Sequence, residues 1–488
     1  MNLLLIAPRW LKVYGSFKYI TKILHFEPPL GLCYLAASCE KEGINTDILD
    51  AEAEGFDVED IISYVKKTKP DFIGITTTTP TIGEAKRVAQ EIKRNFSIPI
   101  IVGGPHVTLV GKQVLEENPE FDFAMTNDCE FRLPMFLKLL WDGKDIQKVG
   151  GLIFRKNGEV IQNFPPTEDV QFDSIPFPAR EKLKIQRYKW FVPGVGERIA
   201  TTFQTSRGCP LRCIFCSERV LYPKTKLRSP ENVIEELKHI KKNHPEIQHI
   251  IFIDDTITLV PKRAYEIFRL MEEEKLGFTF ECETVANRID EKLAEQMVRA
   301  GLKRINFGIE SGDPQILKMV GKGTNIDDIK KAYKIVKSLG VETRGSVIIG
   351  LPYENLKTIA RTIFFITSLK ELDFAYINIA TPYPGTVLRD MILGGEGGSK
   401  LYYSGYDMKR YGSAVVGVGK LKPNHLVKIQ KLAVLLFYMR PRRIMHIIKS
   451  RGFGFAFRLL LGFMLGNFLD LFQRTSSNNG HISRVAGG

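Results

Sequence analysis

In the first part of the chain, short apolar runs typical of buried strands alternate with segments whose apolar positions have the period of a helix. Short apolar runs bounded by polar residues, Gly or Pro predict buried strands. The strands expected are 2–7, 44–50, 71–76, 98–104 and 121–125. Helical periodicity fills the intervals, as at 29–42 and 82–94. Residues 1–145 are therefore predicted to form a doubly wound, Rossmann-like α/β sheet of five parallel strands.

Residues 146–195 are predicted to be a connector. Two short apolar stretches, 150–155 and 160–164, are separated by a turn that contains Asn157-Gly158, which is typical of a β-hairpin. The prolines that follow, from Pro165 to Pro178, exclude regular structure. We expect a hairpin followed by a linker.

The strand and helix pattern resumes over residues 196–393. The strands expected there are 200–205, 249–253, 278–284, 304–312, 343–352 and 373–378. Polar residues cluster where each strand ends, which is where β/α barrels keep their chemistry. This region is predicted to be a (β/α) barrel.

The remaining chain changes character. Residues 394–474 are predicted to be helical, with stretches at 423–439 and 442–450 and a long apolar run at 453–472, and residues 475–488 have the composition of a disordered tail. Thirteen Lys or Arg lie between Lys409 and Arg474 against one acid, Asp470, while the whole chain carries only +14. Basic residues interleaved with apolar helices indicate an anionic membrane surface as partner, and no nucleic acid is expected. A membrane span and a helical cap on the barrel remain open.

The chain of 488 residues has seven cysteines, and three of them stand close together in the spacing C-x3-C-x2-C: Cys209, Cys213 and Cys216. A disulfide framework would need an even count in a small secreted chain. A structural zinc site would need a fourth ligand, and Cys282 stands at no matching interval. Three thiolates predict an iron–sulfur cluster with one open iron, although a zinc site or a chance spacing stays possible. Thiols of this kind need reducing conditions, so we expect a cytoplasmic protein.

The segment 206–216 resembles the cluster motif of the radical S-adenosylmethionine (radical SAM) superfamily, including the aromatic residue before the third cysteine, Phe215. The resemblance implies a [4Fe–4S] cluster whose open iron chelates SAM, and a partial barrel. Gly308-Ile309-Glu310-Ser311-Gly312 is similar to the strand-end motif that holds the SAM ribose and methionine. The segment 345–354, with Gly350, is similar to the glycine motif near the adenine.

Two further residues of the barrel are candidates for cofactor binding. Asp254 follows the buried strand 249–253 and is expected at the catalytic end of the barrel. Arg288 follows the next strand, and it is either a partner for a carboxylate or a surface ion pair.

The first domain resembles the cobalamin-binding domain that precedes many radical SAM enzymes. The candidate cobalamin residues lie at strand ends: Thr76, Thr77, Thr78, Gly103, Gly104, His106, Thr108 and Glu130. Threonine, glycine and acidic residues are also what ordinary βα turns use, so a purely structural role remains an alternative. The loop after the first strand lacks the histidine that ligates cobalt in methionine-synthase-type proteins. We therefore expect cobalamin without a protein ligand on cobalt, and His106 as a lining residue.

These resemblances imply an enzyme that cleaves SAM reductively to a 5′-deoxyadenosyl radical and functionalises an unactivated carbon. Methyl transfer to a hydrophobic or lipid-type small molecule is the first expectation, with ferredoxin or flavodoxin as electron donor and peripheral attachment at the inner face of the membrane. The main alternative is oxidative cyclisation or rearrangement, as in the anaerobic magnesium-protoporphyrin ester cyclase. Methylthiolation of tRNA and a corrinoid-binding sensor are less favoured, because no second cluster motif is present and the cysteine motif is intact.

Overall fold

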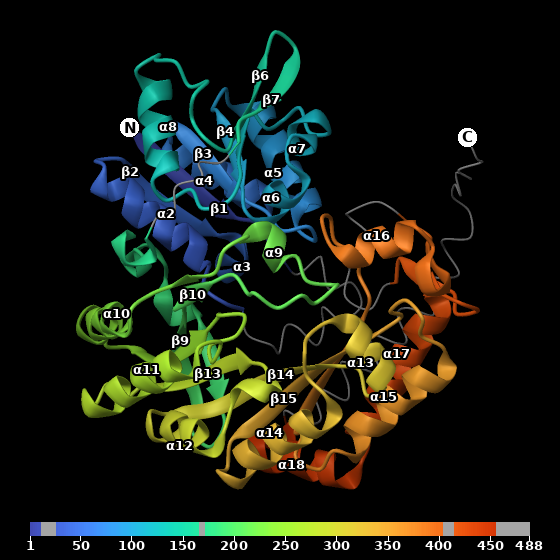
Figure 1. Cartoon of the computed structure of the whole chain (residues 1–488). Coiled ribbons are helices and arrows are strands. Elements are labelled where there is room, and N and C mark those ends of the chain that lie inside the picture. Colours follow the sequence, from blue (N-terminus) through green and yellow to red (C-terminus); the bar gives the residue numbers. More distant parts are fainter. Residues whose placement is uncertain (11–25, 165–170, 404–413, 455–488) are drawn as a thin grey trace.

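The computed structural model describes residues 1–10, 26–164, 171–403 and 414–454. Two α/β domains are stacked, with the N-terminal domain above the barrel in Figure 1. The C-terminal helices lie along one side of the barrel. This arrangement confirms the fold class that the sequence predicts.

The N-terminal sheet has the order β2-β1-β3-β4-β5-β6-β7, and its first five strands are parallel. Its strands are β1 (Asn2–Ala7), β2 (Asn45–Asp50), β3 (Phe72–Thr76), β4 (Ile100–Gly103), β5 (Phe123–Met125), β6 (Leu152–Lys156) and β7 (Glu159–Gln162). The order reverses beside β1, as in doubly wound sheets, which bind ligands beyond the carboxyl ends of their strands.

Helices cover both faces of this sheet, because the parallel strands are apolar on both sides. They are α2 (Leu30–Lys41), α3 (Ala51–Glu54), α4 (Val58–Thr68), α5 (Ile82–Asn95), α6 (Pro105–Val110), α7 (Gln113–Glu116) and α8 (Arg132–Trp141). Helices α2 and α8 share one apolar core, and α4 and α5 share the other.

The predicted hairpin forms, but it extends the N-terminal sheet. Strand β6 pairs antiparallel with β5, whose outer edge would otherwise be unpaired, and β7 pairs with β6. Hydrophobic pattern predicts the hairpin but not its partner. After it, three short 3-10 turns lead to the barrel: η2 (Phe172–Ser174), η3 (Arg180–Lys182) and η4 (Ile185–Arg187).

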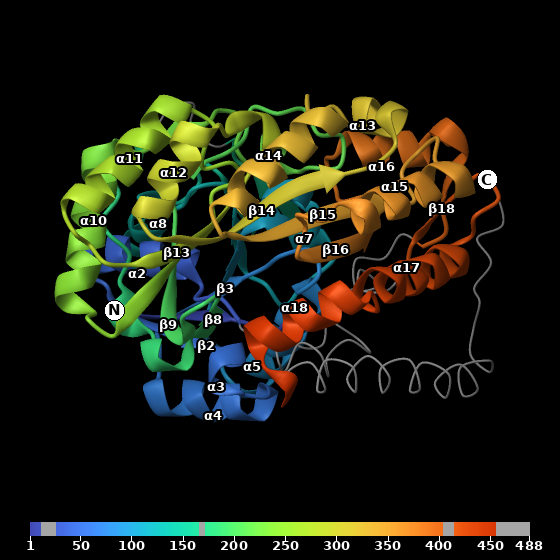
Figure 2. The same cartoon turned by 90° about the horizontal axis from the view of Figure 1, so that it is seen from below.

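The second sheet has the order β16-β15-β14-β13-β12-β9-β8, and six of its strands are parallel while β8 is antiparallel. Its strands are β8 (Lys189–Val192), β9 (Gly196–Phe203), β12 (Ile247–Phe252), β13 (Thr279–Thr284), β14 (Leu302–Glu310), β15 (Glu342–Ile349) and β16 (Phe374–Ile379). Seen from below, the sheet curls into an incomplete barrel (Figure 2). Two small ribbons accompany it: β10 (Ser206–Arg207) with β11 (Lys226–Leu227), and β17 (Ser399–Leu401) with β18 (Val416–Val418).

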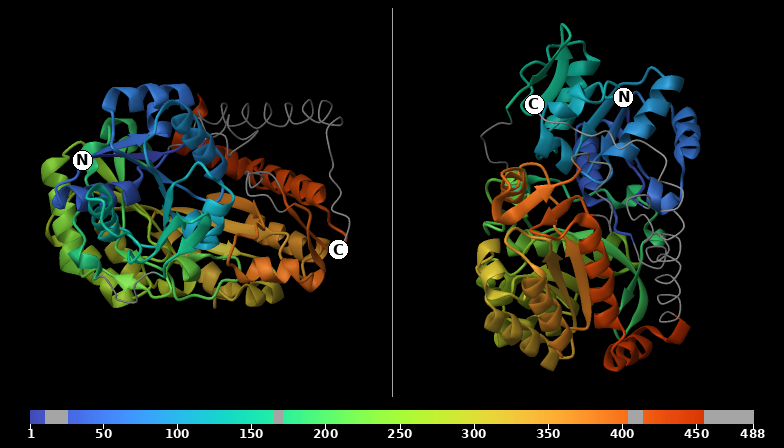
Figure 3. Two further views of the ribbon diagram at one scale, coloured as in Figure 1. Left: turned by 90° about the horizontal axis from the view of Figure 1, so that it is seen from above. Right: turned by 90° about the vertical axis from the view of Figure 1, so that its right-hand side faces the viewer.

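Two C-terminal helices, α17 (Pro423–Tyr438) and α18 (Pro441–Arg451), cover the open edge of the barrel at β16 (Figure 3). The Gln430 side chain donates a hydrogen bond to the Ile377 carbonyl (2.6 Å), and the Tyr438 hydroxyl bonds both the N–H and the C=O of Ala375. These contacts satisfy backbone groups of β16, which is an edge strand in the described part of the chain. Residues 423–451 thus cap the open edge of the barrel, whereas the alternatives of a membrane span, an interfacial helix and a cap concerned the apolar run 453–472.

Basic residues of this cap bind the barrel. Arg440 and Arg443 donate to the carbonyls of Thr367 and Leu369 at the end of α15, where a helix leaves carbonyls unpaired and carries a partial negative charge. Among the described residues, none of the helices is long and apolar enough to cross a membrane. Most of the apolar run 453–472, with the tail, lies outside the described residues.

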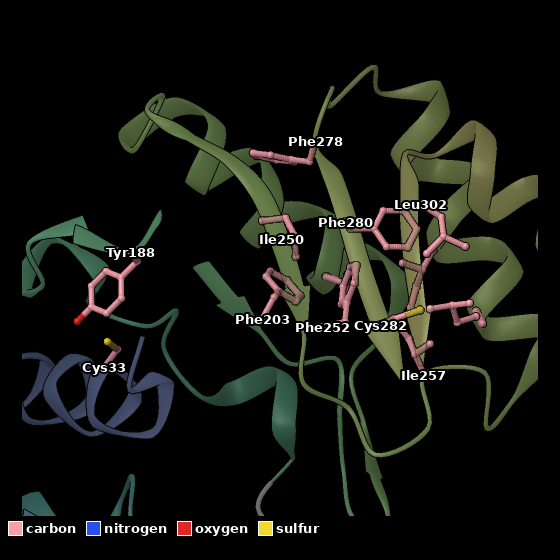
Figure 4. Close-up of a cluster of buried hydrophobic side chains, with 14 of the residues drawn as sticks. Cys33, Tyr188, Phe203, Ile250, Phe252, Ile257, Phe278, Phe280, Cys282 and Leu302 are labelled. Carbon is pink, nitrogen blue, oxygen red and sulfur yellow. The ribbon is translucent and has the colours of Figure 1, made fainter. Parts of the chain in front are cut away.

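The helices that follow the barrel strands lie mainly on its outer face, but α9 contacts α6 of the N-terminal domain. The helices of this region are α9 (Glu218–Leu221), α10 (Pro230–Asn243), α11 (Pro261–Glu273), η5 (Ala286–Arg288), α12 (Glu291–Arg299), α13 (Pro314–Val320), α14 (Ile326–Ser338), α15 (Leu356–Ser368), α16 (Val387–Leu393) and η6 (Glu396–Gly398). Figure 4 shows Phe203, Phe252 and Phe280 packed beneath these helices, with Cys282 in the same apolar layer. Cys282 therefore belongs to the core.

Candidate functional site

A cavity of about 510 Å³ lies between the two domains. Its lining includes all three motif cysteines and polar residues from the ends of the barrel strands, while Trp10 and Pro80 come from the N-terminal domain. The predicted cluster loop and the predicted cobalamin domain thus face one space.

The cysteine loop follows β9 and β10. Gly208 has φ +83°, and a Cβ there would lie 2.7 Å from Cβ of Tyr222, so the turn into Cys209 requires glycine. All three cysteines are free thiols and partly exposed. Within the described ranges, no three His, Cys, Asp or Glu side chains surround a single ion position, as a mononuclear zinc site would require. Three thiols on one cavity without a fourth protein ligand in the motif match the ligand set of a cluster with one open iron.

Burial controls the ionisation of these thiols. It raises the pKa of Cys213 to about 11 and that of Cys216 to about 12. Iron binds the thiolate, so cluster assembly must displace these protons.

Asp254 and Asp255 stand side by side after β12 but point to different places. The Asp254 carboxylate accepts hydrogen bonds from the backbone N–H of Thr205 (3.0 Å) and from the hydroxyls of Thr205 and Ser206. It therefore fixes the start of the cysteine loop, while Asp255 lines the cavity. Burial, with the Glu218 carboxylate beside it, raises the pKa of Asp255 to about 8. Asp254 was the cofactor-binding candidate predicted from the sequence, because the sequence pattern does not distinguish two adjacent aspartates that follow the same strand.

Glu310, at the end of β14, forms a buried ion pair in the cavity. Its backbone has φ +63°, which is strained for a residue with a side chain and is more common at functional sites. Lys322 Nζ lies 2.6 Å from Glu310 Oε1 and 3.0 Å from the Gly308 carbonyl. Lys322 lies in the loop after α13, and no motif or periodicity in the sequence pointed to it. The pair offers one anionic and one cationic group beside Cys213, as the zwitterionic end of SAM would need.

The other residues predicted for SAM lie around this pair. Phe215 lines the cavity. Ser311 bonds Thr362 of α15 (3.0 Å), and a Cβ on Gly312 would lie 2.6 Å from Cβ of Phe365, so both pack against that helix. Gly350 donates to Glu354 in a turn that contacts α17. Arg288 is exposed on η5 and is not among the residues that line the cavity.

The carboxyl ends of β3 and β4 form a narrow surface in the N-terminal domain. Thr77 bonds the Gly103 carbonyl through both its N–H (2.8 Å) and its hydroxyl (2.9 Å), while Thr76 and Thr78 stay partly exposed. A Cβ on Gly104 would lie 2.6 Å from the Thr77 carbonyl oxygen, so only glycine fits there. Close backbone and uncharged hydroxyls suit a large flat ring such as a corrin.

His106 and Thr108 follow on α6. His106 is buried, and its Nδ1 lies 3.1 Å from the Thr79 hydroxyl. Thr108 accepts a hydrogen bond from the Asn127 N–H (2.8 Å). These contacts hold the strand ends together and give His106 a structural partner.

We expect His106→Ala to leave the cobalt environment unchanged. Paramagnetic resonance of bound cob(II)alamin should show no nitrogen splitting from histidine in either protein, because the His106 ring is buried against Thr79. Thr79→Ala, which removes only that hydroxyl contact, is the matched control. A nitrogen splitting that is lost in His106→Ala alone would make His106 a cobalt ligand.

Glu130 lies between the two domains. Arg207, two residues before Cys209, has its Nη1 2.7 Å from Glu130 Oε1 and 2.8 Å from Asp128 Oδ1. The guanidinium lies over the rings of Phe172 (4.5 Å) and Tyr34 (5.1 Å). This cluster ties the cysteine loop to the cobalamin-type domain, and the sequence did not predict that role for Arg207 or Asp128.

Comparison with known proteins agrees with both halves of this site. The radical SAM superfamily matches residues 203–366, and the B12 binding domain matches residues 18–130. An uncharacterised methyltransferase of Pyrococcus horikoshii is 35% identical over 433 residues, which are 87% of this chain and 91% of the relative. The chain therefore belongs to the radical SAM superfamily, in the group that carries a B12-binding domain. It is an enzyme, and its cofactors are a [4Fe–4S] cluster, SAM and cobalamin.

Other relatives have different reactions. An anaerobic magnesium-protoporphyrin IX monomethyl ester cyclase of Rubrivivax gelatinosus is 29% identical over 368 residues, 73% of this chain and 65% of the cyclase. A cytidylyl-2-hydroxyethylphosphonate methyltransferase of Streptomyces wedmorensis is 27% identical over 373 residues, 66% of this chain and 69% of the relative.

The fold matches two solved structures over most of the chain. The cobalamin-dependent SAM radical enzyme OxsB has a TM-score of 0.69 at 17% identity, over 98% of this chain and 80% of that one. The radical SAM methyltransferase TsrM from Kitasatospora setae has a TM-score of 0.66 at 17% identity, over 80% of this chain and 77% of that one. Taken together, the relatives support a cobalamin-dependent radical SAM methyltransferase.

Proposed function

We propose that the protein transfers a methyl group to an unactivated carbon of a small molecule held in the cavity between the domains. The observation that carries this proposal is that one cavity is lined by the three motif cysteines and by Trp10 and Pro80 of the B12-binding domain. When bound, the cluster and SAM supply a carbon radical and cobalamin supplies the methyl group.

The chain's own residues have separate tasks in this proposal. Cys209, Cys213 and Cys216 hold the cluster, and the Glu310–Lys322 pair positions the amino and carboxylate groups of SAM. The Thr and Gly residues at the ends of β3 and β4 support the corrin. A ferredoxin or flavodoxin reduces the cluster.

The lipid-type substrate expected from the sequence has one relative in its favour. A hopanoid C-3 methylase of Methylococcus capsulatus is 24% identical over 385 residues, 77% of this chain and 70% of the relative. However, the basic residues Arg440 and Arg443 bind barrel carbonyls. Membrane attachment would therefore depend on the other basic residues, such as the exposed Lys428, Arg442 and Lys449, and on the apolar run 453–472, most of which lies outside the described residues.

Oxidative cyclisation is the second candidate, because the cyclase relative shares 29% identity over 73% of this chain. The two reactions change the substrate mass differently. Methyl transfer adds a carbon, whereas oxidative cyclisation removes hydrogens.

We expect the reduced, anaerobically reconstituted protein to place a CD3 group on a substrate when it is supplied with SAM labelled in the methyl group. The measurement is mass spectrometry of a small-molecule extract from cells that make this protein naturally, before and after incubation. A product heavier by one CD3 in place of hydrogen supports methyl transfer. Products that have only lost hydrogens would favour cyclisation instead.

A further inference from the structure

The register of β13, β14 and β15 places polar side chains in layers inside the barrel. Glu281, Arg304 and Glu342 occupy matching positions and form the first layer. Arg304 pairs with both carboxylates, and Trp190 donates to Glu281 (2.8 Å). Arg451 of α18 adds a second cation 3.4 Å from Glu342, so two cations match the two carboxylates of this layer.

The next layer, two residues closer to the cysteines, contains Glu283, Asn306 and Arg344 in register. Asn306 donates to Glu283 (2.8 Å), but its carbonyl oxygen is buried and has no hydrogen-bond partner among the described residues. The Arg344 guanidinium donates no hydrogen bond to the described part of the chain. Its Nη1 lies 3.7 Å from Glu281 Oε1, as a long ion pair. This layer therefore has an acceptor, on Asn306, and donors, on Arg344, without hydrogen-bond partners in the described residues.

Two groups of this layer face open space. Glu283 and Asn306 line the same cavity as the cysteines. Arg344 is not among the lining residues, but it stands in register with Asn306 and its side chain is 19% exposed. Gln430 of α17 also lines the cavity, and its carbonyl oxygen is buried without a partner in the described residues. Buried polar atoms are nearly always paired in a folded protein, so these atoms are available to hydrogen-bond a bound ligand or water.

Glu27, just before α2, adds a second carboxylate. Protein surrounds it deeply although its side chain is exposed, and it lies near Glu281, Glu283 and Arg344, but it is not among the residues that line the cavity. Burial, with Glu281 and Glu283 nearby, raises its pKa to about 7. Burial likewise raises the pKa of Glu283. The local excess of negative charge favours a ligand that brings hydrogen-bond donors.

We propose that the substrate is a small water-soluble zwitterion, whose ammonium group binds Glu283 and Asn306 and whose acidic group binds Arg344. The two charged ends of such a ligand can reach both groups at once. Glu283 of β13 and Arg344 of β15 lie on either side of Asn306 of β14, two strand spacings apart. A lipid would leave these groups desolvated and unpaired, which is costly. This inference rests on the proposed function in so far as the cavity is the substrate site.

The experiment uses the reconstituted holoenzyme and two fractions of an extract from cells that make the protein. One holds small zwitterions, retained by a cation exchanger in acid and by an anion exchanger in base, and the other holds chloroform-extracted lipids. Each is incubated with CD3-labelled SAM and reductant. We expect the zwitterion fraction, and not the lipid fraction, to raise 5′-deoxyadenosine formation and to receive the label.

The variants Glu283→Gln and Arg344→Gln should lower this stimulation about tenfold to a hundredfold, because each loses a hydrogen bond to a charged group. The control Glu273→Gln, 55% exposed on α11, should match the wild type. Slow 5′-deoxyadenosine formation without extract should persist in all of them and shows that a variant has folded. Glu283→Gln, which keeps the shape of the side chain, serves if Arg344→Gln fails that check.

The outcomes separate the two proposals. Stimulation by lipids, no stimulation by zwitterions, or zwitterion stimulation that is unchanged in Glu283→Gln would each overturn the substrate class. Stimulation by zwitterions without CD3 in any product would keep the substrate class and reject methyl transfer.

Discussion

Replacing Cys213 with alanine should abolish SAM cleavage. Two thiolates cannot replace three as ligands of the cluster, and the described residues place no other Cys in the cavity. Iron and sulfide contents after anaerobic reconstitution should fall from about four of each per chain to near zero. Reduced protein should form no 5′-deoxyadenosine, measured by chromatography.

Cys282→Ala is the matched control, because Cys282 is a buried thiol of the barrel core beside Phe280 (Figure 4). It should keep its iron and lose only about 1 kcal/mol of stability from the small cavity. If Cys213→Ala retained a full cluster, or if the intact protein never formed 5′-deoxyadenosine, the assignment of the cluster loop would be wrong.

Arg207→Gln should destabilise the protein by about 3–5 kcal/mol, because it leaves the buried Glu130 carboxylate without its cation, while Asp128 keeps Lys226. The free energy of unfolding, from denaturant titration followed by circular dichroism, measures this cost. The cysteine loop should also lose its fixed position relative to the B12-binding domain. We therefore expect product formation to fall more than 5′-deoxyadenosine formation does.

Lys226→Gln tests whether this effect comes from burial. Lys226 pairs with the same Asp128 at 3.0 Å, but its side chain is 22% exposed, and an exposed pair contributes about 1 kcal/mol or less. Equal losses in both variants would show that Arg207 does not carry the contact between the domains.

The periodicity of the sequence predicts most of the fold, because parallel strands buried on both faces are short apolar runs. All eleven strands expected to be parallel are present, from β1 to β16. The cysteine motif also predicts that its three thiols lie close together, since all three are within eight residues. In each case the information is local.

What sequence reasoning missed depends on partners far along the chain. Arg207 pairs with residues about 80 positions earlier, and Glu283 and Arg344 become neighbours only across β14. Asp254 was chosen over Asp255 because hydrophobic pattern does not show which of two adjacent carboxylates turns toward the loop. The C-terminal basic residues were read from charge alone, which does not show that helix α15 presents carbonyls to them.

Helix α17 links the closure of the barrel edge to the lining of the cavity. Through Gln430 it both closes the edge strand β16 and lines the cavity. A chain that ended before Pro423 would expose that edge, and an unpaired edge recruits strands from other molecules and promotes aggregation. Any relative without a helix at this position must cover its last barrel strand with another segment, and that segment would bring different side chains to the substrate. Changes in the C-terminal region are thus a route by which members of this group can acquire new substrates while the cofactor-binding residues stay the same.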